Sequence, residues 1–529
     1  MIYIVGSGPA GVSCAHALLS KGLEVTMLDS GLELETERAK ILERFNSTEL
    51  ENWDLDSINK IKGNTSASTS GSFFKGVYGS DFPYREVSTY LPYKAKNVQP
   101  RISLAKGGLS NIWGAAVLPY VDEDINDWPL SVKDFAPHYE SVFSFMNLAA
   151  VNDDLAKKFP LYSKTYKSLN PCSQTLDLMK DLESNKNTLN SKGFLFGHSR
   201  LAVNTAQSNG KSGCVYCGLC HYGCPVSAIY NSSSTLEELK KNKNFHYIKD
   251  VIVQKISESN GTVTISAITR SKNESVIFSG IRVYLACGVI STTKILLESL
   301  EAYDKELTIK DSQWFLIPLI RYKKSPGTVN EKLYTLSQLF VELFDSNLSS
   351  NVINLQFYMY NDLFLSAIKN ILGFTYPLFK LPVNELLDRL VLAMGYLHSD
   401  SSSAFSVKLQ RGENSKPSEL FLEAKVNKDV NKIIKGVYKK MFENRNLFKA
   451  LPIPGVTKIP KPGYGSHSGG SFPMRLKPKE FETDILGRPT GFSKVHVVDS
   501  AVFPSIPATT ITLTIMANAY RIGSAYNEI

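Results

Sequence analysis

The sequence predicts an α/β protein that combines a discontinuous Rossmann-like domain with an α+β domain built on an antiparallel sheet. A βαβ unit with a glycine-rich turn opens the chain within residues 2–29. Two further apolar strands, at 283–286 and 495–499, lie far downstream and end beside glycine or aspartate. Short alternating segments between them predict antiparallel strands. A parallel sheet with strands from distant parts of the chain, interrupted by a second domain, accounts for this order.

The N-terminal unit has the parts that a dinucleotide site needs. Ile2–Val5 predicts a strand, residues 6–11 (GSGPAG) match the pattern GxGxxG, and residues 12–20 predict a helix. A second strand, residues 23–28, ends at Asp29. This order of strand, turn, helix and acidic residue is typical of a dinucleotide-binding fold.

Each small residue of the turn has a physical role. Gly6 allows the tight turn, Gly8 lets the backbone approach a pyrophosphate, and Gly11 lets the helix pack close to the strand. The helix N-terminus offers N–H groups to phosphates, and the Asp29 carboxylate accepts from a ribose hydroxyl.

Four of the seven cysteines lie in one loop, residues 213–225. The spacing C-x2-C-x2-C-x3-C-P is that of bacterial ferredoxins, and the residues are Cys214, Cys217, Cys220 and Cys224. We expect a 4Fe–4S cluster. A three-iron cluster, a cluster completed by the remote Cys172, a structural zinc ion and a metal-free loop are the alternatives. The remaining two, Cys14 and Cys287, are predicted core residues.

The charge and composition of the chain limit the kinds of molecule that it is expected to bind. The chain has 529 residues, a net charge of +9 and a pI near 8.9. This charge suits anionic substrates or an anionic membrane surface, but there is no basic run with interleaved aromatics of the kind that binds nucleic acid. No secretory segment precedes the first strand, so we expect a cytoplasmic protein with reduced thiols.

We expect residues 306–462 to form the second domain. Strands are expected at 352–360, 403–410 and 419–426, and a helix at 427–442. Alternating strands of this kind favour an antiparallel sheet.

The most apolar stretch is Leu363–Leu397, which charged residues and prolines interrupt too often for a membrane span. We expect it to be helical with a break near residues 377–382. It packs against the sheet, or lines a channel for a long-chain, sterol or polyprenyl-linked alcohol, or makes a weak peripheral contact with a membrane, aided by Lys369 and Lys380.

Three further blocks resemble a known family. They are AKGGLSNIWG (105–114), VYLACGVI (283–290), and a C-terminal block of HSGGSFPM (467–474), VHVVDSAVFPS (495–505) and TLTIMANAYRIG (512–523). In this order, together with the N-terminal unit, they resemble the glucose–methanol–choline (GMC) family of FAD-dependent oxidoreductases. The resemblance covers roughly residues 1–300 and 463 to the end.

The resemblance implies a discontinuous FAD-binding domain and a substrate domain over the flavin. The expected segments are 1–150, 201–305 with the cysteine loop, and 463–529 for FAD, 151–200 as a cap segment, and 306–462 for substrate. No histidine precedes Gly107 as in covalently flavinylated members, so noncovalent FAD is expected.

The resemblance also assigns cofactor contacts. Gly6, Gly8, Gly11 and Asp29 would hold the ADP half and Val251 the adenine, while Gly107, Gly108 and Ser110 would line the isoalloxazine or pyrophosphate, and Asp499 and Ala501 the ribityl–pyrophosphate region.

By the same resemblance, His467 is the catalytic base, because family members open the H-x-x-G-T-x-x-M block with this residue. A near-neutral imidazole can take the hydroxyl proton of the substrate. Thr510 stands where the family has a second histidine or asparagine, and Ser471 and Trp113 also depart from the family pattern.

These features predict an FAD-dependent dehydrogenase that oxidises a CH–OH group of an alcohol, sugar or polyol. Electrons would leave through the cluster to an external acceptor. The alternatives are an oxidase that uses O2 and has a structural cysteine loop, a dehydrogenase of lipid-like alcohols, and a non-catalytic flavoprotein.

Overall fold

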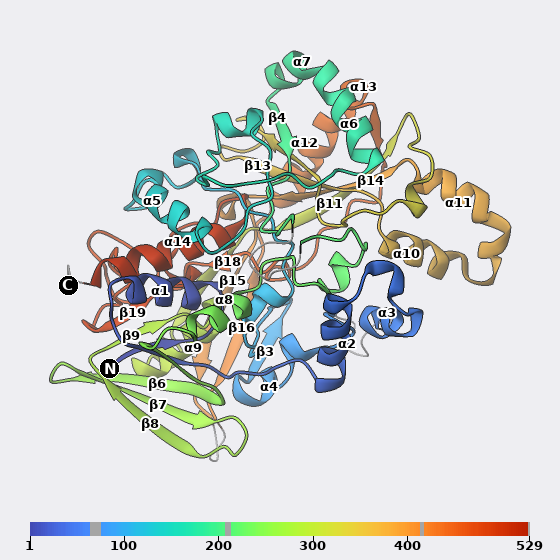
Figure 1. Ribbon diagram of the computed structural model, residues 1–529. Helices are drawn as coiled ribbons and strands as arrows, with labels where there is room; N and C mark the ends of the chain where they lie inside the picture. The colour runs from blue at the N-terminus through green and yellow to red at the C-terminus, as the bar shows by residue number, and fades with distance from the viewer. Residues whose placement is uncertain (64–75, 207–212, 413–416, 527–529) are drawn as a thin grey trace.

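The computed structural model describes residues 1–63, 76–206, 213–412 and 417–526, and its first layer is a five-stranded parallel sheet (Figure 1). The strand order is β19 (Val495–Val497), β9 (Arg282–Leu285), β1 (Ile2–Val5), β2 (Val25–Leu28) and β5 (Phe245–Ile248). Strands from distant parts of the chain therefore end at one edge. The predicted discontinuous α/β domain is confirmed.

Helices cover this sheet. They are α1 (Pro9–Ser20), α8 (Ser232–Leu239), α9 (Val289–Ser299) and α14 (Ile511–Ser524). The first and last of them pack closely, because Gly523 has no side chain: a Cβ there would lie 3.0 Å from that of Ala17. The C-terminal helix is thereby fixed beside the glycine-rich turn.

Residues 247–256 belong to two strands. Residues 247–256 divide into the end of β5 and the start of β6 (Val251–Ser259), because Asp250 between them adopts a left-handed φ of 70°. The second part starts a three-stranded meander with β7 (Thr262–Thr269) and β8 (Ser275–Gly280).

The second domain is built on a six-stranded antiparallel sheet. Its order is β17 (Ala450–Pro452), β11 (Trp314–Arg321), β14 (Leu390–Tyr396), β13 (Ile353–Tyr358), β12 (Leu339–Leu343) and β4 (Phe194–His198). Its core is a separate apolar cluster, to which α6 (Ser173–Ser184) and α12 (Val430–Glu443) contribute. The segment predicted as a cap thus supplies an edge strand, β4, to this sheet.

A mixed sheet lies between the two. Its order is β18 (Ser468–Gly469), β10 (Glu306–Asp311), β15 (Ala404–Gln410), β16 (Glu419–Lys425) and β3 (Tyr93–Lys96). The predicted strands at 352–360, 403–410 and 419–426 all exist, and β18 carries the residues that follow His467.

The apolar stretch Leu363–Leu397 is only partly helical. Helix α10 (Asp362–Leu372) ends at Gly373, whose φ is 53°, and a 3-10 helix (Gly373–Phe379) and α11 (Lys380–Leu387) follow. The predicted break is therefore misplaced. The prediction is also wrong for the end, because residues 390–396 form the central strand β14, paired on both sides.

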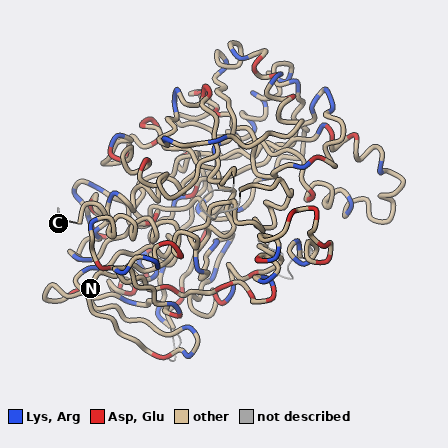
Figure 2. The backbone as a smooth tube through the Cα atoms, viewed as in Figure 1, with Lys and Arg blue, Asp and Glu red and all other residues tan. Residues whose placement is uncertain are grey.

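The remaining helices lie at the periphery: α2 (Thr36–Ser47), α3 (Leu55–Lys62), α4 (Val87–Tyr90), α5 (Val132–Phe143), α7 (Lys186–Ser191) and α13 (Arg445–Phe448). Within the described parts of the chain, every helix is too short or too polar to cross a membrane. Basic and acidic positions are interspersed along most of the backbone (Figure 2).

Candidate active site

A cavity of about 580 Å³ lies along the carboxyl edge of the parallel sheet. Residues directly after β1, β2, β9 and β19 line one side, and side chains of the antiparallel sheet line the other. The N-terminus of α14 also faces it, at Thr510–Thr512. Ligands of open α/β sheets bind at this edge, and helix N-termini favour negative charge.

The glycine-rich turn is shaped as predicted. A Cβ on Gly6 would lie 2.7 Å from the carbonyl oxygen of Ala286, and one on Gly11 would lie 1.9 Å from that of Gly6. By contrast, a Cβ on Gly8 would meet nothing within 4 Å and would occupy the cavity. Gly6 and Gly11 therefore serve packing, and Gly8 leaves the backbone accessible to a ligand.

Asp29 ends β2 at the cavity. Its Oδ2 accepts from the Ser7 hydroxyl, the Gly31 N–H and the Tyr247 hydroxyl at 2.9–3.1 Å. Its Oδ1 accepts from the Ser7 N–H at 3.1 Å and keeps capacity for a further donor. Burial raises the pKa of this carboxyl, while these hydrogen bonds oppose the change. The arrangement fits a ribose hydroxyl.

Other predicted contacts divide into two groups. Gly108, Ser110, Val251 and Asp499 line the cavity. Gly107 and Ala501 lie one layer behind. The Gly107 N–H donates to the Ser7 hydroxyl at 2.9 Å, and the Ala501 N–H donates to Oδ1 of Asp499 at 2.9 Å.

The prediction that Cys287 is a core residue is wrong. This cysteine was assigned to the core with Cys14, which is fully buried in α1. Cys287 instead lines the cavity between β9 and α9, because the chain must leave the strand there to begin the helix at Gly288.

His467 and Thr510 face the same cavity. The His467 ring stacks on Tyr396 with centroids 4.8 Å apart, and its buried Nδ1 has no hydrogen-bond partner among the described residues. Burial lowers the pKa of His467 to about 4, so the imidazole is neutral at pH 7. The Thr510 Oγ1 accepts from the Leu118 N–H at 3.1 Å, which leaves its proton to donate.

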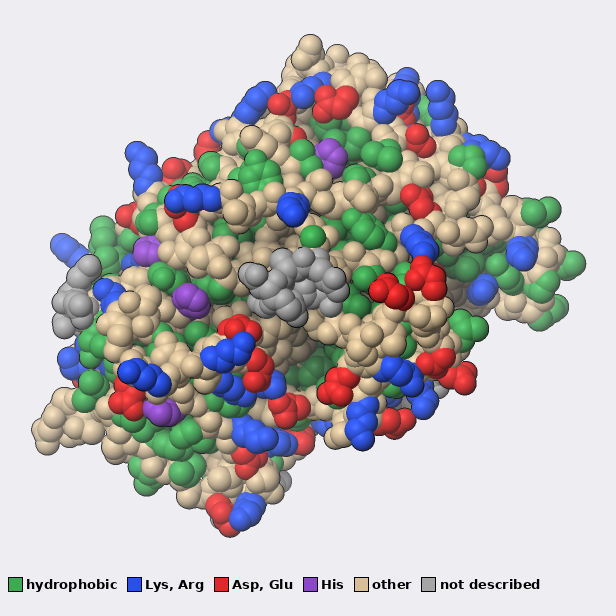
Figure 3. All heavy atoms as spheres, viewed as in Figure 1, with side chains coloured by type: hydrophobic (Ala, Val, Ile, Leu, Met, Phe, Trp, Pro, Cys, Tyr) green, Lys and Arg blue, Asp and Glu red, His purple; other side chains and the backbone are tan. Residues whose placement is uncertain are grey.

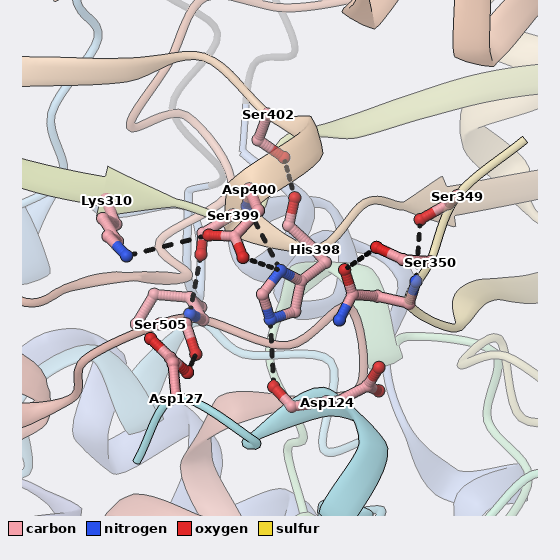
Figure 4. Close-up of polar contacts among 12 residues, drawn as sticks. Asp124, Asp127, Lys310, Ser349, Ser350, His398, Ser399, Asp400, Ser402 and Ser505 are labelled. Atoms are coloured by element: carbon pink, nitrogen blue, oxygen red, sulfur yellow. Dashed lines mark hydrogen bonds and ion pairs between the residues drawn. The ribbon is translucent and has the colours of Figure 1, made fainter.

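A buried polar network fixes the segment before Thr510 (Figure 4). His398 is 2% exposed, and its Nε2 lies 3.0 Å from the Asp124 carbonyl oxygen. The adjacent Ser399 exchanges two hydrogen bonds with Ile506 at 2.8 and 2.9 Å. Ser505 donates to Asp127 at 2.7 Å. The chain therefore approaches α14 in one conformation.

Several cavity residues were not predicted. The guanidinium carbon of Arg101 lies 4.5 Å from the centre of the Tyr464 ring, and the ring centres of Trp314 and Tyr464 are 5.5 Å apart. The buried Nε of Arg101 has no hydrogen-bond partner among the described residues. Most come from segments without a motif. Tyr464 alone had a signal, because it lies three residues before His467.

The four loop cysteines converge. Cys214, Cys217, Cys220 and Cys224 line one small cavity of about 20 Å³. The Thr335 N–H donates to the Cys220 sulfur at 3.3 Å and the Ala228 N–H to the Cys224 sulfur at 3.2 Å. The remote candidate, Cys172, does not line this cavity, and its thiol lies 3.4 Å from the Thr175 hydroxyl.

The thiols are not arranged around a single ion. Among the described residues, no three His, Cys, Asp or Glu side chains are placed to hold a metal ion. A zinc ion would need all four sulfurs about 2.3 Å from one point. Burial raises the pKa of Cys214 to about 12 and that of Cys224 to about 11, so these groups are neutral thiols unless a cation stabilises the thiolates.

The cysteine loop is close to the large cavity. A further cavity of about 440 Å³ is lined by Cys220, Cys224 and Trp113. Trp113 also lines the 580 Å³ cavity, and its indole N–H donates to the Tyr230 carbonyl oxygen at 2.8 Å. One fixed aromatic ring therefore borders both sites.

The cavity follows the carboxyl edge of a parallel sheet and includes the glycine-rich turn, which is the arrangement of a dinucleotide-binding site. Residues 104–302 match the family model described as GMC oxidoreductase. The resemblance to the GMC family is thereby confirmed over this region. Enzymes of this family bind FAD, and the open space at Gly8 and the free capacity of Asp29 fit that cofactor.

Solved structures show the same fold over the whole chain. Pyridoxine 4-oxidase from Mesorbium loti has a TM-score of 0.62 at 11% identity, covering 100% of this chain and 99% of that one. Formate oxidase from Aspergillus oryzae RIB40 has a TM-score of 0.60 at 13% identity, covering 100% and 98%. A second formate oxidase structure gives 0.59 at 13% identity, also covering 100% and 98%. No curated protein matches the sequence.

Proposed function

We propose that this protein is an FAD-dependent oxidoreductase that oxidises the CH–OH group of an alcohol, sugar or polyol, with FAD bound noncovalently. The observation that carries this proposal is the neutral imidazole of His467, whose Nδ1 has no hydrogen-bond partner among the described residues, in the cavity that the glycine-rich turn also lines. FAD, when bound, accepts the hydride from the carbinol carbon.

The residues of this chain supply the proton chemistry. His467 accepts the substrate hydroxyl proton, because burial keeps its imidazole in the basic, unprotonated form. Thr510 donates a hydrogen bond to the substrate oxygen, because its own oxygen already accepts from Leu118. The stacked ring of Tyr396 and the network around His398 limit the positions that these two side chains can adopt.

We also propose that the four loop cysteines hold an iron–sulfur cluster that passes electrons to an external acceptor. Three observations support this proposal: the ferredoxin spacing, the position of all four cysteines around one small cavity, and the N–H donors to two of the sulfurs. Trp113 lines the 580 Å³ cavity and also the 440 Å³ cavity that Cys220 and Cys224 line.

An oxidase is the second candidate. The solved structures with this fold are named as oxidases, and an empty cysteine loop would leave O2 as the acceptor. The two candidates share the hydride step and differ in where the electrons go.

A single anaerobic preparation of the protein tests the dehydrogenase and the oxidase candidates together. The protein is purified without oxygen, and iron, acid-labile sulfide and FAD are assayed together. We expect flavin, iron and sulfide, with flavin bleaching on addition of the correct alcohol. The substrate panel includes alcohols that carry a carboxylate or phosphate, because Arg101 adds a positive charge to the cavity. Absence of iron together with peroxide release in air would favour the oxidase. No bleaching by any CH–OH donor would contradict the enzymatic proposal.

A further inference from the structure

The hairpin of α10 and α11 projects from the second domain (Figure 1). Five large apolar side chains on it point into solvent, and we call them the apolar tip: Ile371 (82% exposed), Phe374 (95%), Leu378 (82%), Phe379 (47%) and Leu381 (81%). In Figure 3 this projection is largely apolar at its surface. The other strongly exposed apolar residues, such as Leu55, Ile277 and Leu476, are scattered over separate elements.

The packing of the hairpin does not account for the tip. Its base is held by the core, because Val383 and Leu387 are buried there and Phe364 and Ile368 pack against the same cluster. An ion pair between Lys62 and Asp362 also fixes the start of α10. The exposed side chains lie beyond these contacts. A contiguous apolar patch of this kind marks an interaction surface in a water-soluble domain.

The charges within the tip segment are two lysines, and the next acidic residue, Glu385, pairs with Lys324 and Arg389. From residue 363 to 384 there is no Asp or Glu, and the only charged side chains are Lys369 and Lys380. Figure 2 shows these basic positions on the projection. The Lys369 ammonium lies 5.0 Å from the centre of the Tyr376 ring. Apolar and aromatic residues flanked by lysines are the composition of segments that lie in a lipid–water interface, where long lysine side chains reach the headgroups.

We propose that the apolar tip docks on a membrane surface that contains anionic phospholipids. Helix α10 has 11 residues and cannot span a bilayer, so the tip enters the interface without crossing it. The two lysines match the negative headgroups, and the apolar tip matches the acyl boundary.

Docking there would bring the large cavity to the membrane. Asn361, Leu363 and Phe364, at the base of α10, line that cavity, and Leu363 is also 38% exposed at the surface. A lipid-soluble molecule would then reach the cavity from the interface. The docking itself does not depend on the proposed oxidation.

Vesicle flotation of the FAD-loaded full-length chain tests the proposal. Vesicles of phosphatidylcholine alone are compared with vesicles that also contain phosphatidylglycerol. We expect the protein to float with the anionic vesicles, and the triple variant Ile371→Ser, Phe374→Ser, Leu378→Ser to lose at least tenfold in binding. The matched control, Leu55→Ser, Ile277→Ser, Leu476→Ser, removes three apolar residues elsewhere that are 68–75% exposed, and it should float as the wild type does.

Two further readouts make the result specific. Lys369→Gln with Lys380→Gln should remove the preference for anionic over neutral vesicles. Phe374→Trp should show a blue-shifted emission on vesicle addition, measured against the wild-type background. Wild-type protein that stays in solution with both vesicles would overturn the proposal. So would a concentration-dependent dimer that the triple variant abolishes, because the tip would then bind a second copy. Substrate bleaching of the flavin, measured in the triple variant without vesicles, tests the proposed function separately.

Discussion

His467 is held by its backbone and by one aromatic neighbour. The Ser312 N–H donates to its carbonyl oxygen at 2.9 Å, and Tyr396 stacks on the ring. No charged group contributes to its pKa, which burial alone lowers to about 4. An imidazole in this setting keeps its lone pair for the substrate across the neutral pH range.

Replacing this imidazole should slow the hydride step. We expect His467→Ala to lower the rate of flavin reduction in a single turnover by about 10²–10⁴-fold, while FAD stays bound. In the wild type, the rate should fall as the pH decreases towards about 4, because protonation removes the base. His198→Ala, outside the cavity, serves as the control. An unchanged rate in His467→Ala would remove this residue from the proposed role.

A side chain at position 8 should affect cofactor binding without affecting folding. A Cβ there meets no protein atom within 4 Å but enters the cavity. We therefore expect Gly8→Ala to leave the Tm of the apoprotein unchanged and to weaken FAD binding at least tenfold, measured by fluorescence titration. Gly11→Ala, whose Cβ would lie 1.9 Å from the Gly6 oxygen, should instead destabilise the fold. Equal FAD affinity in Gly8→Ala and wild type would contradict the assigned position of the pyrophosphate.

Among the helices and strands, those fixed by neighbouring residues could be predicted from the sequence better than those fixed by pairing with distant strands. The βαβ unit was predictable because its turn, helix and strands are adjacent in the chain. The stretch Leu363–Leu397 was not, because the same apolar residues suit a helix or a buried strand. Pairing of β14 with β11 and β13 decides for the strand, and those partners lie outside the local sequence.

The cysteine loop gives a prediction at this scale. If its sulfurs hold a cluster, Cys220→Ala should lose most of the iron and sulfide while FAD remains. Cys172→Ala is the matched control, because this buried thiol lies outside the cavity of the loop. We expect it to keep full iron content. Equal iron loss in both variants, measured per FAD after anaerobic purification, would contradict the assignment of the four ligands.

For the whole molecule, the sequence predicted the cavity residues at the parallel sheet better than those at the antiparallel sheet. Gly8, Asp29 and Asp499 lie at ends of strands where motifs place them. Trp314, on β11, reaches the same cavity only because the second domain folds over the first. Contacts created by docking of two domains leave no local pattern in either segment, so the substrate could not be predicted.

The interior of the second domain also makes the stability of the whole molecule depend on pH. Glu342, on β12, is fully buried, and burial raises its pKa to about 8, with Asp124 acting in the same direction and Arg200 opposing it. Its Oε1 accepts from the Asn354 amide, and its Oε2 has no partner among the described residues. Burial also raises the pKa of Asp124 to about 7. Both carboxyls are therefore protonated in the folded protein when they would be ionised in the unfolded chain.

The sign of the effect follows from proton binding. Between the ordinary glutamate pKa of 4.5 and about 8, the folded state binds more protons, so the free energy of unfolding falls as the pH rises. We expect a lower Tm near pH 8.5 than near pH 6. Glu342→Gln should raise the Tm at both values, and by about 2–4 °C more at about pH 8.5 than at about pH 6, because the amide needs no proton and the penalty for the carboxyl grows across this interval. Glu37→Gln, on the exposed face of α2, is the control and should change neither value. Parallel pH profiles for Glu342→Gln and wild type in thermal unfolding would show that this carboxyl is ionised in the folded protein.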